Sequence, residues 1–384
     1  MIFLIASVFI VYGLTNYYIG QNLILWSQHL FPSMNTNLLW IIYALLALTT
    51  VFTFTSSFMK IKKDTRIVQW LGRFGEFWMG VYFYSLLLWT ISDLILFIGR
   101  LIHLIPYSNI TQFITGSIVI LITSIIVIYG MYNARQLKTT SYDININKPS
   151  TIDTLSVILI SDLHFGYTND LRYLNTLVTK INQLQPDIVL MAGDIINGDY
   201  NAIYKPDEMA ALCRNIHSTY GTYACLGNHD AGNSYEEMIT FFKDSNITLL
   251  NDAYTIIDNA FIIAGRVDST PIGLQGNKRS TNIVLDGIDT TLPIIVMDHQ
   301  PSNINQYDST IDLILCGHTH KGQIFPFNLV TNKLFTVDYG YYRESPDSSQ
   351  VIVSSGAATW GPPMRIGSHS EVVNINLSLN KKEK

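Results

Sequence analysis

The chain has 384 residues, which leads us to expect two or three folding units rather than one. Its formal net charge of −5 at pH 7, with an isoelectric point near 6.0, argues against a broad nucleic-acid-binding surface. Its three cysteines form no Cys-x-x-Cys pair and indicate no disulfide framework.

The first 135 residues contain most of the long apolar runs and few charged residues. Four segments within them approach the roughly 20 apolar residues that a helix needs to cross a bilayer. These segments span residues 2–21, 38–58, 77–98 and 111–132. The first lacks the basic start of a secretory signal and is followed by three more apolar segments. We therefore predict a transmembrane domain of about four helices over residues 1–135.

The distribution of lysine and arginine predicts the orientation of these segments. The link between the first and second segments carries neither residue, and the link between the third and fourth carries only Arg100. The link between the second and third segments carries Lys60, Lys62, Lys63, Arg66 and Arg73. By the positive-inside rule, we expect a multi-pass protein of the cell (inner) membrane whose C-terminal domain is cytoplasmic.

Asp93 lies inside the third apolar segment, where a carboxylate is costly and is a candidate functional residue. The simpler interpretation is that Asp93 bonds to a neighbouring helix or pairs with Arg100, which lies on roughly the same helix face. We favour this interpretation because no chain of ionisable residues accompanies Asp93.

After residue 135 the composition becomes that of an ordinary globular protein. Residues 136–152 are polar and are expected to form a linker, and residues 379–384 are expected to form a disordered tail. Between them, over residues 153–378, strands are predicted at 155–160, 188–191, 223–226, 248–257, 261–267, 294–297 and 311–316, and helices at 170–184, 206–217 and 235–243. This alternation predicts an α/β fold that binds its ligand beyond the carboxyl ends of the strands.

Residues of the types that bind metals follow five of the predicted strands. They occur as Asp162-Leu163-His164, Gly193-Asp194, Gly227-Asn228-His229-Asp230, Asp298-His299 and Gly317-His318-Thr319-His320. A single loop of this composition would be ordinary, because Asp, Asn and Gly are common turn residues. Histidine in four of five such loops indicates instead a set of ligands gathered at one rim of the fold.

Carboxylate oxygen together with neutral imidazole nitrogen suits Mn, Fe or Zn, whereas an all-oxygen Mg or Ca site would not need so many histidines. Several such ligands around a shared carboxylate favour a two-metal centre, which activates water and holds phosphoryl oxygens during a displacement. In Asp-x-His and His-x-His, alternate residues of an extended segment point the same way, so both side chains can face one site.

The series DLH, GD, GNHD, H and GHTH, in this order and spacing, resembles the calcineurin-like metallophosphoesterase superfamily over residues 153–378. The membrane segments, the run GHTHKGQI and the late stretch GAATWGPPMR at 356–365 resemble the bacterial membrane-anchored branch of that family. Lys321 departs from the GHTHGGQ of this branch, and Asn197 stands where many members carry aspartate. The resemblance implies a four-layer αββα sandwich, preceded here by the transmembrane helices.

The resemblance also implies a role for each residue of the motifs. One ion would be bound by Asp162, His164 and His320, the other by Asn228, His299 and His318, and both by Asp194 as a bridging ligand. His229 would be catalytic, protonating the leaving alkoxide or stabilising the transition state. Independently of the resemblance, we expect Asp230 to hold His229 by a hydrogen bond, with capping of the following segment as the alternative. A hydroxide bridging the two ions would attack phosphorus in line.

The sequence therefore predicts a membrane-anchored, binuclear metal-dependent phosphoesterase that hydrolyses a phosphomonoester or a phosphodiester. Its cofactors would be two divalent ions, Mn, Fe or Zn. The anchor suggests a lipid-linked substrate and membrane lipids as partners, and no nucleic acid is expected. A non-catalytic membrane receptor or scaffold is one alternative, although the intact ligand set and His229 count against it. A metal-dependent nuclease is another, disfavoured by the acidic balance and the lack of a basic stripe.

Overall fold

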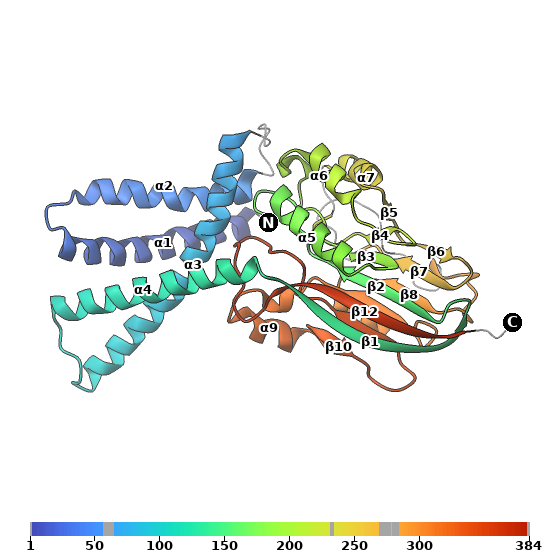
Figure 1. Cartoon of the computed structure of the whole chain (residues 1–384). Coiled ribbons are helices and arrows are strands. Elements are labelled where there is room, and N and C mark those ends of the chain that lie inside the picture. Colours follow the sequence, from blue (N-terminus) through green and yellow to red (C-terminus); the bar gives the residue numbers. More distant parts are fainter. Residues whose placement is uncertain (1, 57–64, 231–233, 269–277, 279–283, 382–384) are drawn as a thin grey trace. The chain divides into compact units, whose positions relative to one another are not determined.

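The computed structural model describes residues 2–56, 65–230, 234–268, 278 and 284–381 (Figure 1). The chain divides into two compact units. The helical unit comprises Met1–Ile61, Trp70–Tyr132 and Gly361–Met364, and the sheet unit comprises Lys62–Gln69, Asn133–Trp360 and Arg365–Lys384.

Four long helices build the helical unit. They are α1 (Ile2–Leu30), α2 (Thr36–Thr55), α3 (Arg66–Leu101) and α4 (Asn109–Ala134). The side chain of Asn35 caps α2 by accepting the backbone N–H groups of Asn37 and Leu38. Each helix contributes one side chain to a small buried cluster, made of Ile19, Tyr43, Trp89 and Val119. Most other apolar side chains of these helices point outward, as in helices that face lipid.

Within the described residues, three helices are long and apolar enough to cross a membrane, namely α2, α3 and α4. The prediction of about four is therefore corrected to three. The first predicted segment does form a helix, but α1 continues through Asn16, Gln21, Asn22 and Gln28, which make its second half more polar. Lys60, Lys62 and Lys63, on which the orientation depends, lie outside the described residues, as does the predicted helix end at Phe58. The cytoplasmic orientation stays a prediction.

Asp93 bonds to a neighbouring helix, as the simpler interpretation expects. Its carboxylate accepts the hydroxyl of Tyr18 from α1. The alternative pairing is wrong in the part of the chain that the structure describes, because Arg100 lies instead over the ring of Tyr107, 4.2 Å from its centroid. Asp93 is thus accounted for by a contact between helices.

Two six-stranded sheets form the core of the sheet unit. The first has the order β1 (Leu137–Ser150), β12 (Ser370–Lys381), β2 (Thr154–Ile160), β3 (Ile188–Ala192), β4 (Thr222–Cys225) and β5 (Ile247–Leu249). The second has the order β10 (Gly340–Tyr342), β11 (Gln350–Val353), β9 (Leu313–Cys316), β8 (Ile294–Met297), β7 (Phe261–Gly265) and β6 (Ala253–Ile257). Strands β2 to β5 run parallel, and so do β7, β8, β9 and β11. These mixed sheets confirm the predicted α/β class.

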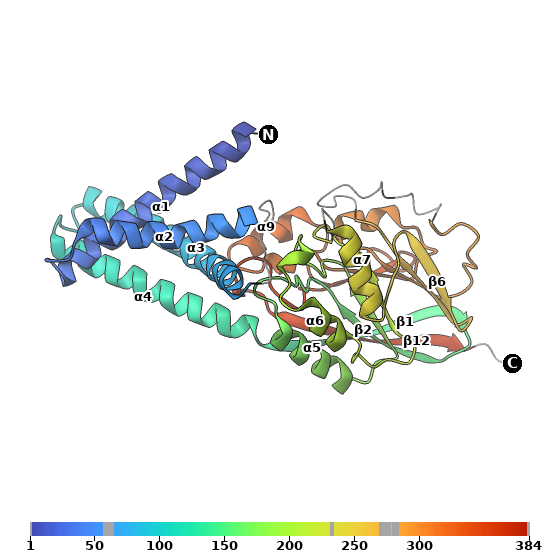
Figure 2. The same cartoon turned by 90° about the horizontal axis from the view of Figure 1, so that it is seen from above.

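Alternating side chains of the central strands enter two different cores. Val157 and Leu159 of β2 pack with Phe261 of β7 and Met297 of β8 between the sheets. Ile158 faces the other way, into a core shared with the helices α5 (Leu171–Gln183), α6 (Pro206–Cys213) and α7 (Tyr235–Asp244). In Figure 2, α5 and α6 lie along one side of the sheets and α9 (Phe327–Leu334) along the other. The remaining short helices are η2 (Tyr200–Ala202), η3 (Pro301–Gln306) and η4 (His320–Gly322).

The predicted linker over residues 136–152 is wrong, because most of it forms the edge strand β1, which pairs in parallel with β12. Only one face of an edge strand needs to be apolar, and here Ile144 and Ile146 are buried while the alternating residues are largely polar. The predicted tail is corrected in the same way. Residues 379–381 belong to β12, where Leu379 pairs with Ile146, and residues 382–384 lie outside the described residues.

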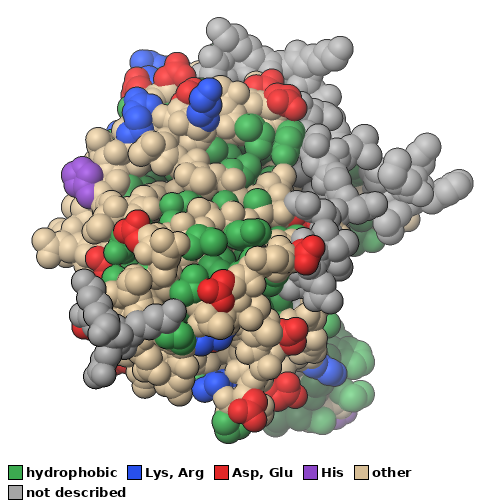
Figure 3. Space-filling view, turned by 90° about the vertical axis from the view of Figure 1, so that its right-hand side faces the viewer, with side chains coloured by type: hydrophobic (Ala, Val, Ile, Leu, Met, Phe, Trp, Pro, Cys, Tyr) green, Lys and Arg blue, Asp and Glu red, His purple; other side chains and the backbone are tan. Residues whose placement is uncertain are grey.

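The face of the molecule drawn in Figure 3 carries acidic and basic side chains interspersed with hydrophobic ones. A protein that tracks a nucleic-acid backbone presents a continuous basic stripe instead. The described residues of this face form no continuous basic stripe.

Glu371 joins β12 to the strands beside it. Its carboxylate accepts the backbone N–H of Ser355 at 2.8 Å and the hydroxyl of Thr140 at 2.5 Å, and it lies 3.3 Å from His369 Nε2. Burial alone would raise the pKa of Glu371, but the hydrogen bonds from His369, Thr140 and Ser355 outweigh burial and lower it below the ordinary 4.5.

We expect Glu371→Gln to lower the free energy of unfolding by about 1 kcal/mol or more at pH 7. A carboxylate whose pKa is lower in the folded than in the unfolded chain stabilises the fold at any pH above its unfolded-state pKa. This stabilisation is lost as the pH falls through the folded-state pKa. The difference from the unmodified protein should therefore shrink below pH 4.5 in thermal unfolding of the full chain. Glu344 is exposed, so Glu344→Gln is the matched control and should leave thermal unfolding unchanged both at pH 7 and at acid pH. A difference that is the same at pH 7 and at acid pH would contradict this role.

Candidate metal centre

The five loops predicted to carry ligands follow β2, β3, β4, β8 and β9. Because β2, β3 and β4 are parallel in one sheet and β8 and β9 are parallel in the other, each set of loops leaves its sheet at one edge. The two sheets pack face to face through their shared core, so the two edges meet. All seven predicted ligands lie in these loops, as do His229 and Asp230.

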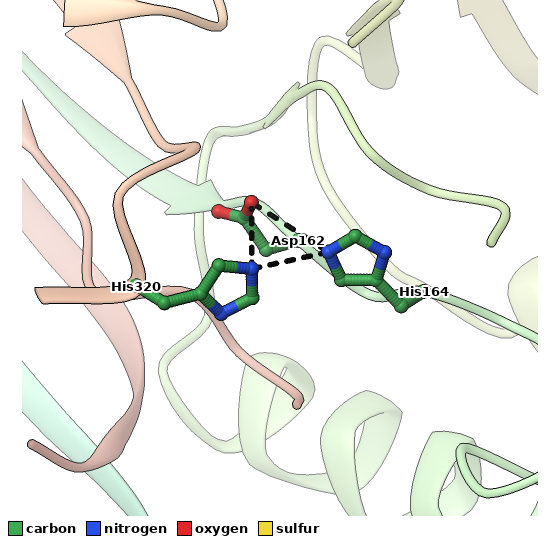
Figure 4. A group of neighbouring side chains, drawn as sticks. All are labelled: Asp162, His164 and His320. Atoms are coloured by element: carbon green, nitrogen blue, oxygen red, sulfur yellow. Dashed lines mark hydrogen bonds and ion pairs between the residues drawn. The ribbon is translucent and has the colours of Figure 1, made fainter. Parts of the chain in front are cut away.

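Asp162, His164 and His320 form the first group of side chains (Figure 4). His320 Nε2 lies 3.3 Å from Asp162 Oδ1 and 3.1 Å from His164 Nε2. All three side chains are buried. Two imidazole nitrogens facing each other beside a carboxylate are typical of a cation site, since neutral imidazoles and carboxylates are metal ligands.

Asp194, His299 and His318 form the second group. His299 Nε2 lies 3.2 Å from Asp194 Oδ2. Asn228 adds an amide oxygen, because its Oδ1 lies 2.9 Å from His318 Nδ1. The structure therefore brings together all four residues expected around the second ion.

Asp194 connects the two groups. Its Oδ2 lies 3.2 Å from His299 Nε2 in the second group and 3.7 Å from His164 Nε2 in the first. Its Oδ1 accepts the backbone N–H of His229 at 2.8 Å, which fixes the carboxylate orientation. One carboxylate next to both groups is the arrangement that a bridging ligand requires.

Backbone strain is concentrated at these loops. Asp162, His164, Asp194, His318 and His320 all have positive φ, between 43° and 71°. Residues other than glycine rarely adopt this region, and such a conformation costs roughly 1–3 kcal/mol, so it persists only where the surrounding structure imposes it. Five strained residues among seven candidate ligands mark a functional site.

Neighbouring groups orient several of the ligands. Ser161 donates its hydroxyl to Asp162 Oδ2 at 2.6 Å, and the backbone N–H of His318 lies 3.1 Å from both oxygens of the same carboxylate. His299 donates its Nδ1–H to the carbonyl of Ala192 at 2.8 Å, which turns Nε2 toward Asp194. This second layer of contacts is typical of metal sites, where it fixes the tautomer and the ring orientation.

The electrostatics favour neutral imidazoles at three of the four histidines. Burial lowers the pKa of His164 to about 3 and that of His318 to about 4, and it lowers the pKa of His320 well below the ordinary value. Burial acts in the same direction on His299, but the charge of Asp194 outweighs it and holds the pKa of His299 well above its ordinary value. Neutral imidazole is the form that binds a metal, and a cation would take the place of the His299 proton beside Asp194.

The donor set fits two divalent ions. It consists of two carboxylates, four imidazoles and one amide oxygen, and most of these side chains are buried. Burial of two carboxylates without a cation is costly, and burial raises the pKa of Asp162 to about 6. A mixed oxygen and nitrogen set of this kind suits Mn, Fe or Zn.

Asp230 does not hold His229 in the part of the chain that the structure describes, so this prediction is wrong. Its carboxylate accepts the backbone N–H groups of Ile195 at 3.0 Å, Ile196 at 2.7 Å and Gly227 at 2.9 Å. The loops after β3 and β4 are thereby tied together. Asp230 is a positioning residue, and sequence alone cannot show that its carboxylate turns toward these amides.

His229 lies beside the first group without belonging to it. Its ring meets the ring of His164 edge to face, with centroids 5.1 Å apart, and its other neighbour is Trp360 at 5.7 Å. Burial lowers the pKa of the His229 imidazole. A histidine next to a metal group, and itself outside it, is placed to exchange a proton with a bound ligand.

Arg365 is the last residue of the stretch GAATWGPPMR at 356–365. Its side chain is fully buried and donates to the carbonyls of Ser355, Ala358 and His320 at 2.7, 2.5 and 3.3 Å. Arg365 therefore ties the loop that carries His320 to the segment after β11. By contrast, Trp360 is 45% exposed.

The two departures from the resembled motifs both lie close to the centre. Lys321 stands with its ammonium 4.1 Å from the centroid of the Tyr339 ring, so its contact is a cation–π interaction. Asn197 reaches the first group, where its side-chain hydrogen bond counteracts part of the fall in the pKa of His164 that burial causes.

We expect Gly227→Ala to weaken metal binding by roughly 10-fold to 100-fold, as changes behind metal ligands often do. A Cβ at Gly227 would collide with the carboxylate and the backbone nitrogen of Asp194. Isothermal titration with Mn²⁺ measures the effect. Gly166→Ala is the matched control, because a Cβ there would make an ordinary 3.4 Å contact with Asn197 and should leave Mn²⁺ affinity unchanged. Equal affinity in both variants would contradict the position of Asp194.

Known proteins are similar to this chain. A model of the calcineurin-like phosphoesterase family matches residues 155–322. An uncharacterized metallophosphoesterase of Campylobacter jejuni is 30% identical over 395 residues, covering 99% of this chain and 100% of the relative. A transmembrane protein with a metallophosphoesterase domain from Danio rerio is 29% identical over 67% of this chain and 61% of its own length. A UDP-2,3-diacylglucosamine pyrophosphatase of Chlamydia trachomatis is 25% identical over 58% of this chain and 84% of its own.

Proposed function

The chain belongs to the calcineurin-like phosphoesterase family, and on this premise we propose that it is a membrane-anchored phosphoesterase with two divalent metal ions, acting on a phosphomonoester or a phosphodiester. One observation carries the proposal. Asp194 lies within 3.7 Å of a histidine from each of two buried groups of metal-binding residues, which is what a bridging ligand requires. Family membership makes the protein a metal-dependent phosphoric ester hydrolase.

In this proposal each motif residue has one task. Asp162, His164 and His320 hold one ion, Asn228, His299 and His318 hold the other, and Asp194 contacts both. When bound, the ions would polarise the phosphoryl oxygens and lower the pKa of a water molecule so that it attacks phosphorus. Asp230 keeps the loops after β3 and β4 in register, and Arg365 keeps the His320 loop in place.

His229 supplies the proton that the leaving oxygen needs. Its ring stands next to His164 and Trp360, so it can reach a phosphoester bound at the centre without taking a ligand position. The imidazolium form would donate the proton as the P–O bond breaks, or would stabilise the charge that develops on that oxygen.

The membrane helices suggest where the enzyme works. We propose an integral, multi-pass protein of the inner membrane, with the sheet unit in the cytoplasm as a four-layer αββα sandwich. The orientation is supported by Lys60, Lys62 and Lys63, which lie between α2 and α3 in the sequence, and by Arg66 and Arg73 near the start of α3. A lipid-linked substrate is supported by the α2, α3 and α4 helices and by the name of the Chlamydia trachomatis relative, whose substrate carries two acyl groups.

Hydrolysis of two chromogenic esters by the full chain tests the function. With added Mn²⁺, we expect hydrolysis of p-nitrophenyl phosphate, of bis-p-nitrophenyl phosphate or of both, and we expect chelation to abolish it. The receptor or scaffold alternative predicts a different result, namely that the protein binds Mn²⁺ and hydrolyses neither ester. That result would overturn the proposed function.

We expect His229→Gln to lower kcat by about 10²- to 10⁴-fold, the usual contribution of a proton donor. Metal content should stay the same, because His229 lies outside both ligand groups. Steady-state kinetics and metal analysis of the same preparation separate the two effects. Loss of one ion in this variant would show that His229 is a ligand rather than a proton donor.

A further inference from the structure

Exposed apolar side chains of the sheet unit gather on one segment and its neighbour. We define the apolar patch as Phe325, Phe327, Leu329, Val330, Leu334 and Trp360, all of which are exposed. Among the described residues after 133, the other large exposed hydrophobic residues are Tyr254, Ile256 and Tyr341. A cluster of this kind is unusual on a soluble surface and marks a site of interaction.

Helix α9 provides most of the patch and buries none of its residues. Its leucines, Leu329 and Leu334, are 61% and 72% exposed, and Val330 is 50% exposed. Burial of leucine and valine is among the main contributions to stability, so a helix that leaves them exposed forgoes that contribution. In Figure 2, α9 lies on the side of the sheets away from α5 and α6.

The patch adjoins the metal centre directly. Phe335, the residue that follows α9, has its ring 6.0 Å from the ring of His318. Trp360 lies 5.7 Å from His229. Gln323 links these segments, because it donates to the carbonyl of Trp360 and accepts its N–H, both at 2.9 Å. A molecule whose phosphoryl group occupies the centre would therefore have its remaining part beside the patch.

Two further features favour a lipid as this molecule. Helix α4, a candidate membrane span, ends at Ala134, and β1 begins at Leu137, so only residues 135 and 136 lie between them in the chain. Helix α9 also carries the exposed Lys333 among its apolar residues. Helices that contact bilayers combine apolar side chains with lysine or arginine, which attract anionic headgroups.

Resting on the proposed function, we infer that the substrate is an amphiphilic lipid phosphoester whose hydrocarbon chain lies on the apolar patch while its phosphoryl group enters the metal centre. The apolar patch thus selects for the hydrocarbon chain of the substrate, and the metal centre selects for its phosphoester group. Leu329, Val330 and Trp360 are specificity-determining residues in this arrangement.

The experiment uses two phosphonates that differ only in chain length. Methylphosphonate and dodecylphosphonate are compared as inhibitors of p-nitrophenyl ester hydrolysis by the full chain in lipid nanodiscs. The test variant is Leu329→Asp combined with Val330→Asp, which alters two exposed side chains. The matched control is Ile256→Asp, a comparable change at a 44% exposed position on β6. Because dodecylphosphonate partitions equally into the same nanodiscs, any difference between the variants reflects the protein.

In the unmodified protein and in the Ile256→Asp control, we expect dodecylphosphonate to inhibit at least about tenfold more strongly than methylphosphonate, through burial of its chain. In the double variant the ratio of inhibition by dodecylphosphonate to inhibition by methylphosphonate should fall at least about fivefold. The two introduced carboxylates would oppose burial of the hydrocarbon chain. Ester turnover should not change in the Ile256→Asp control, and the Mn²⁺ content of the double variant should equal that of the unmodified protein, which shows that the metal centre is intact. An unchanged ratio in the double variant overturns the inference. Failure of the proposed function is distinct, because then no form of the protein would hydrolyse either ester.

Discussion

Asp194→Asn is expected to lower Mn²⁺-dependent ester hydrolysis by at least about 1,000-fold, which corresponds to roughly 4 kcal/mol of transition-state stabilisation. Asparagine has the shape of aspartate and can still accept the backbone N–H of His229 through its amide oxygen. It lacks the negative charge that faces His164 and His299, one from each ligand group. The loss of ester hydrolysis should therefore result from weaker metal binding rather than from unfolding of the protein.

Three measurements distinguish these causes. Metal analysis of Asp194→Asn should give fewer ions per chain than the unmodified protein, while thermal unfolding in the presence of chelator should be similar. Asp258→Asn, at an exposed position, is the matched control and should retain full activity and metal content. Hydrolysis by Asp194→Asn at the rate of the unmodified protein would show that the centre has been assigned wrongly.

Arg365→Met is expected to lower the free energy of unfolding of the sheet unit by about 3 kcal/mol or more. Methionine approximates the apolar part of the arginine side chain but leaves the carbonyls of Ser355 and Ala358 without their donor. The His320 carbonyl loses Arg365 but keeps the backbone N–H of Gln323. Each buried acceptor left unpaired costs about 1–3 kcal/mol. Burial lowers the pKa of the Arg365 guanidinium to about 10, so it stays charged at neutral pH.

Thermal unfolding of the full chain measures this loss as a fall in Tm of several degrees, because about 1 kcal/mol shifts the Tm of a unit this large by roughly 2–4 °C. The exposed Arg343 also donates to two carbonyls, those of Ser348 and Pro346. Arg343→Met should nevertheless leave Tm almost unchanged, since water can replace the lost donor. If both variants lower Tm equally, Arg365 does not have the structural role described here.

The seven predicted ligands could be found from sequence because each follows immediately on a short apolar strand. A strand fixes the direction of the residues just beyond its end, so Asp162, Asp194 and Asn228 share one rim because β2, β3 and β4 are parallel. Glycines beside them, such as Gly227 and Gly317, leave no room for a Cβ next to the ligands and point to the same loops.

Other features depend on contacts that no local pattern records. The hydrogen bonds of Asp230 run to a loop 34 and 35 residues earlier in the chain, and Arg365 reaches a carbonyl 45 residues away. The sequence of strand β1 predicts a linker, because an edge strand of mainly polar residues lacks a hydrophobic run. The apolar run at 325–330 resembles a buried segment in the sequence, and its exposure becomes visible only in the folded chain.

Metal content measured together with hydrolysis tests the binuclear centre most directly. The full chain, stripped by a chelator and reloaded with increasing Mn²⁺, is expected to bind two ions per chain, as a two-metal site requires. Ester hydrolysis should be absent in the stripped protein and should rise as the second ion binds. Full hydrolysis by the stripped protein, or by a chain that holds a single ion, would contradict a centre bridged by Asp194.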